Sequence, residues 1–300
     1  MKVFDNFFEK IYDKDIALTG MTEELFAVYV NKLYDNKKNI LIVTSNLVES
    51  NSLYRSISNY TDNVYLFPMD DFLTSEAMAI SPDLMVTRLE TMEAISSGKA
   101  SIVITNLMGY LRYLPTKKEY LKSCLSLKVD DEISPKELVE KLTNIGYERT
   151  TLVTKTGEIG VRGFVIDIFP LGESNPVRLE FFGDTIDSIR YFDGKTQKSL
   201  NEIKSIEIYP YTEIFSNDTS IPEDKKATKY LNEYSDVTNI GGYLDNHVTI
   251  YKDKSAILIN YKQICTDVLE YREEKDTDFK GSYMFSFDDI YENNALHYLT

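Results

Sequence analysis

Histidine and cysteine are scarce in this sequence, which holds two residues of each kind: His247, His297, Cys124 and Cys265. The cysteines are far apart in the chain, form no C-x-x-C pair and have no histidine near them. We therefore expect two free thiols in a reducing compartment. A zinc centre or a Ser-His-Asp triad needs more ligands and bases than these residues supply, so we expect neither kind of site.

Basic residues are also in deficit. Lysine and arginine together number 33 against 48 acidic residues, which gives a formal net charge of −15. Affinity for nucleic acids comes mainly from cations that neutralise phosphates. The field of so acidic a chain opposes such binding even at a local basic patch. The composition therefore favours a protein partner or a small molecule over DNA or RNA.

Long apolar runs are absent as well. No stretch approaches the roughly 18 residues that a membrane span requires, although a hydrophobic content of 43% is ample for buried cores. The first residues, Met1 to Asn6, include an acid and lack the apolar stretch of a signal peptide. We expect a cytoplasmic protein that contacts no membrane, and its length suits two or three domains.

The first third of the chain alternates strands with helices. The elements that we expect there are strands at 39–44, 64–67 and 101–105, a helix at 47–57, and a helix that opens at Ser81-Pro82 and stops at Gly98. Continuously apolar strands are typical of a sheet that is covered on both faces. This rhythm predicts an α/β layer with a mostly parallel sheet.

After residue 115 the rhythm changes to one helix and closely spaced strands. We expect a helix from Ser134-Pro135 to Gly146, then strands at 161–169, 177–182, 185–192 and 203–209, with tight turns at Gly183-Asp184 and Asp193-Gly194. This pattern predicts a small α+β domain with an antiparallel sheet. A polar connection at 216–226 leads to another α/β piece, with a strand at 256–259 and a helix at 263–274. The expected domains are therefore residues 1–115, 116–209 and 210–300.

A phosphate-binding loop is missing where the first domain would carry one. The pattern G-x-x-x-x-G-K-[ST] combines backbone amides, a lysine and a hydroxyl around phosphates. Here a single glycine, Gly20, precedes Glu23 and Glu24. Carboxylates suit the first turn of a helix but repel a nucleotide. Asp70-Asp71 would suit Mg²⁺, yet acids that cap a helix are commoner in such a loop, so we expect no metal and no cofactor.

Two stretches resemble a known protein family. Residues 157–170 contain V-R-G-F-V-I-D-I-F-P, and residues 177–190 read V-R-L-E-F-F-G-D-T-I-D-S-I-R. Both are similar to a signature shared by the excinuclease B subunit (UvrB) and the transcription-repair coupling factors (Mfd). Leu66-Phe67-Pro68, Ser81-Pro82-Asp83 with Arg88-Leu89, and Phe192-Asp193 with 197–200 resemble the coupling factors in particular. The resemblance is good over residues 15–210 and loose over 210–300.

The resemblance implies both a fold and a role. It implies a degenerate P-loop or RecA-like α/β layer, built from two sequence segments, with the small α+β domain inserted between them. In coupling factors the ATP-dependent motor lies elsewhere, so this chain resembles a non-catalytic N-terminal fragment. Its middle domain would bind the excinuclease A subunit (UvrA) and recruit it to stalled RNA polymerase. RNA polymerase and double-stranded DNA would bind to other domains of the full-length protein.

The resemblance also places the partner-binding residues at Arg162, Arg178 and Phe182. Side chains at every second position of a strand share a face, so Arg178, Glu180 and Phe182 are expected to lie together. An arginine beside an exposed aromatic ring is typical of an interface hot spot. Glu180 is a secondary candidate, since it suits an ion pair with an arginine across the sheet. The alternative is a hairpin with one solvated face and a phenylalanine at its rim.

The orientation of two arginines, Arg162 and Arg190, is harder to predict. In a straight strand Arg162 would share a side with Phe164, which is expected to be buried, unless Gly163 marks a bulge that redirects it. Alternation groups Arg190 with the apolar Ile186 and Phe192, so we leave it out of the site. Two further functions stay open: a nucleotide-dependent DNA translocase or damage-recognition subunit, and an autoinhibitory scaffold within a longer protein.

Overall fold

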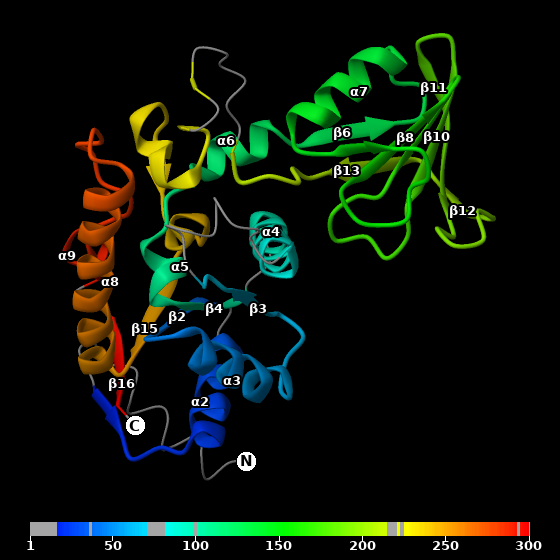
Figure 1. Cartoon of the computed structure of the whole chain (residues 1–300). Helices are drawn as coiled ribbons and strands as arrows, with labels where there is room; N and C mark the ends of the chain where they lie inside the picture. The colour runs from blue at the N-terminus through cyan, green and yellow to red at the C-terminus, as the bar shows by residue number, and fades with distance from the viewer. Residues whose placement is uncertain are drawn as a thin grey trace. The chain divides into compact units, whose positions relative to one another are not determined.

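The computed structural model describes residues 17–35, 38–70, 82–98, 101–214, 221–222, 225–292 and 295–299. The chain divides into two compact units (Figure 1). The first unit comprises Met1–Thr116 and Glu223–Thr300, and the second unit is Lys117–Pro222. Each unit has a hydrophobic core of its own.

The first unit is an α/β structure around a six-stranded parallel sheet, in the order β1-β16-β15-β2-β4-β3. Its elements are β1 (Ala17–Thr19), α2 (Glu23–Asp35), β2 (Asn39–Thr44), α3 (Leu47–Ser58), β3 (Val64–Phe67), α4 (Pro82–Ser96), β4 (Ile102–Asn106), α5 (Leu107–Leu111), β5 (Leu114–Pro115), η2 (Thr228–Glu233), β14 (Val237–Thr238), η3 (Ile240–Tyr243), β15 (His247–Lys252), α8 (Lys254–Lys275), α9 (Phe287–Ile290) and β16 (Leu296–Leu299).

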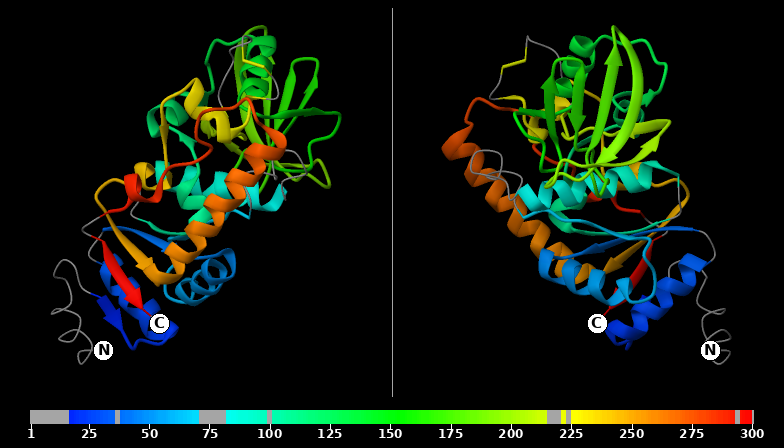
Figure 2. Two further views of the ribbon diagram at one scale, coloured as in Figure 1. Left: turned by 60° about the vertical axis from the view of Figure 1, so that its left-hand side comes forward. Right: turned by 90° about the vertical axis from the view of Figure 1, so that its right-hand side faces the viewer.

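The predicted strands and helices of the first third are confirmed. Strands β2 and β4 lie inside the sheet and are buried on both faces, which explains their continuously apolar sequences. Figure 2 shows α2 and α3 on one face of this sheet and α4 on the other. Gly98 adopts a φ of +78° just after α4, as a helix C-terminal glycine does. The expected cap of α4, Ser81, lies outside the described residues.

The expected strand at 256–259 is wrong. These residues belong to α8, and the strand of this region is β15, which ends at Lys252. A short apolar run does not by itself distinguish a strand from a buried helix segment. The side chain of Asp253 decides the boundary, because its Oδ1 accepts a hydrogen bond from the Ala256 amide at 3.1 Å and caps the helix.

A histidine and a carboxylate join β15 to the segment before β16. The His247 ring contacts the Leu244 carbonyl through Nδ1 and Glu292 Oε1 through Nε2, both at 2.9 Å. Burial disfavours the charged imidazole, but these hydrogen bonds prevail and raise the pKa of His247 above its ordinary value. Burial also opposes ionisation of Glu292, yet the bond to His247 lowers the pKa of its carboxyl group. Each group thus favours the charged form of the other, which strengthens the hydrogen bond between them.

This pair predicts how the stability of the first unit depends on pH. A raised histidine pKa stabilises the fold fully below the unfolded-state value of about 6.5, and the contribution is lost as pH rises through the folded-state pKa. The loss should be below about 1.5 kcal/mol, the lower value for a hydrogen bond to a charged group, because burial of the ring opposes the charged form. Urea denaturation at a series of pH values from about 6 upward measures it. The variant His247→Gln should lack this pH dependence, and a dependence that persists in the variant would contradict the assignment.

The second unit is built on a six-stranded sheet in the order β12-β11-β10-β9-β8-β7, antiparallel except for the β7–β8 pair. Its elements are α6 (Lys117–Lys122), β6 (Leu125–Lys128), α7 (Pro135–Asn144), β7 (Glu148–Thr150), β8 (Glu158–Arg162), β9 (Val165–Ile168), β10 (Val177–Phe182), β11 (Thr185–Phe192), β12 (Ser199–Ile203) and β13 (Ser205–Ile208). The predicted start of α7 is confirmed, because Ser134 Oγ caps it by accepting from the Glu137 amide at 3.2 Å. Leu138 and Leu142 of α7 pack on one face of the sheet.

Two predicted strands of this unit need correction. Residues 161–169 are not one strand, because Gly163, with a φ of +61°, turns the chain between β8 and β9. The strand that follows β11 in the antiparallel sheet is β12, and not the expected strand at residues 203–209. The latter contain β13, which pairs with β6 in a separate two-stranded sheet. Which strand β13 joins depends on residues far away in the chain, so local patterns do not show it.

Candidate protein-interaction surface

The predicted site lies on the face of the antiparallel sheet that α7 does not cover, here called the outer face. In β10 every second side chain, beginning with Val177, is buried in the core. The intervening side chains of Arg178, Glu180 and Phe182 point to the outer face, and Phe182 is 82% exposed. The predicted alternation along this strand is therefore confirmed.

A buried carboxylate organises the arginines of the outer face. The side chain of Asp167, in β9, is only 2% exposed and receives the Arg178 guanidinium through Nε at 2.6 Å and Nη2 at 2.8 Å. Its Oδ2 also accepts a hydrogen bond from Nη2 of Arg162. The hydrogen bond to Asp167 raises the pKa of Arg178 further above its ordinary value. One carboxylate thus holds both predicted arginines.

Further contacts restrict Arg178 more than Arg162. The Arg178 guanidinium lies 4.4 Å from the centroid of the Phe192 ring, and its Nη2 donates to Gln197 Oε1 at 3.2 Å. The side chain of Arg178 is 15% exposed and that of Arg162 is 52% exposed. About half of the Arg162 side chain therefore reaches solvent, whereas Arg178 is largely enclosed by its neighbours.

Glu180 has a partner within the sheet. One of its carboxylate oxygens accepts from Arg190 Nη2, and the other accepts from Ser188 Oγ at 3.3 Å. An ion pair between Glu180 and an arginine across the sheet was expected, and that arginine is Arg190. The contact is partly solvated, so it adds little to stability.

The exclusion of Arg190 from the outer face is wrong. The pairing of β10 with β11 shifts register at Asp187, which is the extra residue of a β-bulge. The bulge resets the alternation, so Arg190 lies opposite Arg178 and not on the buried side with Ile186. No residue type in β11 marks a bulge, and the signal appears only in the register of the neighbouring strand.

Phe164 was expected to be buried, but it is 63% exposed. It occupies the turn after Gly163, while Arg162 pairs with Val165 as the last residue of β8. Gly163 is thus the first residue of a two-residue hairpin turn and not a bulge in a continuous strand. This turn brings Arg162 to the outer face and leaves Phe164 in solvent.

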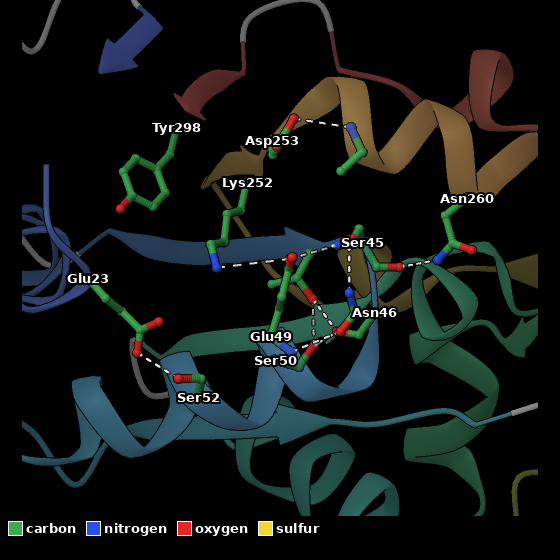
Figure 3. A network of polar contacts seen from close by, with 12 residues as sticks. Glu23, Ser45, Asn46, Glu49, Ser50, Ser52, Lys252, Asp253, Asn260 and Tyr298 are labelled. Atoms are coloured by element: carbon green, nitrogen blue, oxygen red, sulfur yellow. Dashed lines mark hydrogen bonds and ion pairs between the residues drawn. The ribbon is translucent and has the colours of Figure 1, made fainter. Parts of the chain in front are cut away.

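A second candidate site is the carboxyl edge of the parallel sheet, where the sequence lacks a phosphate-binding loop. Glu23 and Glu24 begin α2, as expected. The Glu23 carboxylate accepts a hydrogen bond from Ser52 Oγ at 2.9 Å (Figure 3). It also accepts one from Ser56 Oγ at 2.6 Å, and the two bonds join α2 to α3. Glu23 therefore forms a contact between two helices.

The same edge has a shallow crevice where β2 and β15 lie side by side and their following helices lead in opposite directions across the sheet. Such a switch point is the usual ligand position in α/β sheets. The crevice measures about 490 Å³ and is lined by Ser45, Asn46, Ala256, Ile259, Asn260 and Gln263. Within its lining Asn260 donates to the Ser45 carbonyl, and nearby Lys252 lies 4.0 Å from Glu49 (Figure 3). These contacts make it a weaker candidate than the outer face.

The described residues show neither a metal-binding cluster nor a membrane-spanning helix. Within these ranges, no group of three or more histidine, cysteine, aspartate or glutamate residues is arranged to hold a metal ion. Among the helices that the structure describes, none combines the length and apolar character of a membrane span. Neither Cys124 nor Cys265 is part of a disulfide.

Known proteins are similar to most of this chain. Residues 125–214 match the family model of the UvrB interaction domain. A transcription-repair-coupling factor of Staphylococcus epidermidis is 32% identical over 238 residues, which cover 77% of this chain and 20% of that protein. The transcription-repair-coupling factor of Bacillus subtilis is 32% identical over 215 residues, 71% of this chain and 18% of that protein. The chain thus spans about a fifth of the length of these relatives. It is therefore a homologue of the transcription-repair-coupling factors, and its residues 125–214 are a UvrB interaction domain.

Proposed function

We propose that this chain is the non-catalytic N-terminal module of a transcription-repair coupling factor, and that its outer face docks the excinuclease A subunit (UvrA). The observation that carries the proposal is Phe182, which is 82% exposed on a strand whose neighbouring arginines are held in place by a buried carboxylate. A large exposed ring beside an oriented arginine has the composition of a protein–protein hot spot. Docking would recruit the excinuclease to an RNA polymerase stalled at a lesion.

The remaining features fit the same role. The first unit would be a degenerate P-loop or RecA-like layer, since Glu23 occupies the region of the missing phosphate loop and binds Ser52 and Ser56 instead. RNA polymerase and double-stranded DNA would bind other parts of a longer protein, because this chain spans only about a fifth of its relatives. A net charge of −15 also favours a protein partner for this module.

Calorimetric titration of the purified excinuclease A subunit with the full chain tests the proposal. We expect the wild-type chain to bind. Phe182→Ala should bind at least about 30-fold more weakly, which corresponds to about 2 kcal/mol at a hot spot. Arg162→Ala should also weaken binding, because Arg162 is the more exposed of the two arginines on Asp167. Arg178→Ala is a less direct probe, since its loss also disturbs the outer face.

A matched control is Leu200→Ala, another exposed apolar residue of the second unit. It lies in β12 next to Ser199, which pairs with Phe192 at the far end of β11 from Phe182. Binding should be unchanged in this variant. ATP titrated alone should give no heat. A chain that binds ATP and not the excinuclease A subunit would refute docking and favour an ATP-dependent damage-recognition or translocase subunit.

A further inference from the structure

Two hairpin turns lie next to each other at one end of the antiparallel sheet. Gly163 and Gly183, with φ values of +61° and +64°, each take the first position of a two-residue turn. Strands β9 and β10 run antiparallel between these turns, and the amide of Phe181 donates to the carbonyl of Phe164 at 2.9 Å. The backbone of Phe164 is therefore bonded to the residue that precedes Phe182.

Both aromatic side chains at this end are in solvent. Among the described residues, Phe164 and Phe182 are the exposed phenylalanines, at 63% and 82%. Single exposed apolar residues are common on protein surfaces, but two whose backbones lie at neighbouring turns can together offer the apolar area of an interaction site. Folding does not require a ring at either place, because the turn at residues 163–164 depends on the glycine and the strand needs only its inward side chains.

We infer that Phe164 is a second aromatic anchor of the docking surface, and that the excinuclease A subunit presents one apolar cleft to both rings. The inference rests on the proposed function and extends its surface beyond β10 to the turn between β8 and β9. Arg162, the last residue before that turn, borders the pair and supplies the polar rim. Hot-spot residues cluster in this way, with apolar anchors at the centre and solvated charges around them.

The two kinds of contact respond differently to salt. Attraction between partly exposed charges falls as ionic strength rises, whereas burial of an aromatic ring is not weakened by screening. The affinity lost in Phe164→Ala should therefore be the same at about 50 mM and about 300 mM salt. The affinity lost in Arg162→Ala should be smaller at the higher concentration. A salt-independent loss in Phe164→Ala would indicate that the ring enters an apolar cleft. A loss that shrinks with salt would indicate that the variant acts indirectly, through the arginines.

The experiment is a titration of the excinuclease A subunit with full-chain variants. Phe164→Ala should bind about 10-fold more weakly than wild type, and Phe164→Leu should stay within about 3-fold because an apolar cleft accepts leucine. In the double variant Phe164→Ala, Phe182→Ala the two losses should not be additive, since neighbours that share one cleft are coupled. The control Leu152→Ala, an exposed apolar residue elsewhere in the same unit, should bind like wild type.

Each alternative result has a distinct meaning. If Phe182→Ala weakens binding and Phe164→Ala does not, the inference is wrong and the proposed function stands. If the wild-type chain does not bind at all, the proposed function itself fails. Sedimentation of the chain alone provides a further check: self-association that Phe164→Ala abolishes, with unchanged affinity for the excinuclease A subunit, would assign the pair to a contact between copies and overturn the inference.

Discussion

Replacing Asp167 with alanine is expected to lower the free energy of unfolding of the second unit by about 3–5 kcal/mol. The carboxylate is almost fully buried and accepts two hydrogen bonds from Arg178. Without it, a guanidinium that is 15% exposed keeps its charge and loses its main acceptor, with Gln197 as the remaining one. Arg162 contributes less to this loss, because half of its side chain already reaches solvent.

Urea denaturation measures this effect, with hydrogen exchange to assign each transition to one of the two units. The matched control is Glu180→Ala, which removes a partly solvated carboxylate from an arginine of the same face and should cost no more than about 1 kcal/mol. Asp167→Asn should fall between the two, because an amide keeps one acceptor and loses the charge. Equal losses for Asp167→Ala and Glu180→Ala would show that the buried carboxylate does not organise the outer face.

The second large effect is expected at Gly146, which ends α7. The amide of Gly146 donates to the Thr143 carbonyl and that of Tyr147 donates to Leu142, which is a Schellman motif. Gly146 has a φ of +97°, and an added Cβ would lie 2.6 Å from the backbone oxygen of Tyr211. Gly146→Ala therefore combines an unfavourable conformation with a clash against backbone, and should destabilise the second unit by about 3 kcal/mol or more.

The control for this variant is Gly98→Ala. Gly98 has a φ of +78°, but an added Cβ there would meet no atom of the described residues within 4 Å. It should cost about 1 kcal/mol, the conformational part alone, measured in the unfolding transition of the first unit. If Gly146→Ala costs no more than Gly98→Ala, the contact with Tyr211 must relax easily, and the close packing of that segment on the end of α7 would be contradicted.

Elements with a local cause were predictable. Apolar runs of strand length predicted β2, β3 and β4, because central strands of a parallel sheet are buried on both faces. Ser134-Pro135 predicted the start of α7, and Gly183-Asp184 predicted the turn between β10 and β11. The wrong predictions concern short apolar runs, whose secondary structure depends on residues outside the run. Residues 256–259 are helical because Asp253 caps α8, and residues 161–169 form two strands because Gly163 turns the chain.

The sequence by itself determined the two kinds of sheet, the absence of a phosphate-binding lysine, and the side of β10 on which Arg178, Glu180 and Phe182 lie. These features follow from residue type and from a period of two, which each strand carries in its own residues. The tertiary structure alone decided that Asp167 binds Arg162 and Arg178, and that Arg190 lies on the same face as Arg178. It also decided that Phe164 is exposed. Each of these depends on register between strands, on a bulge or on a turn, and register is set by pairing between segments and not by the sequence of either segment alone.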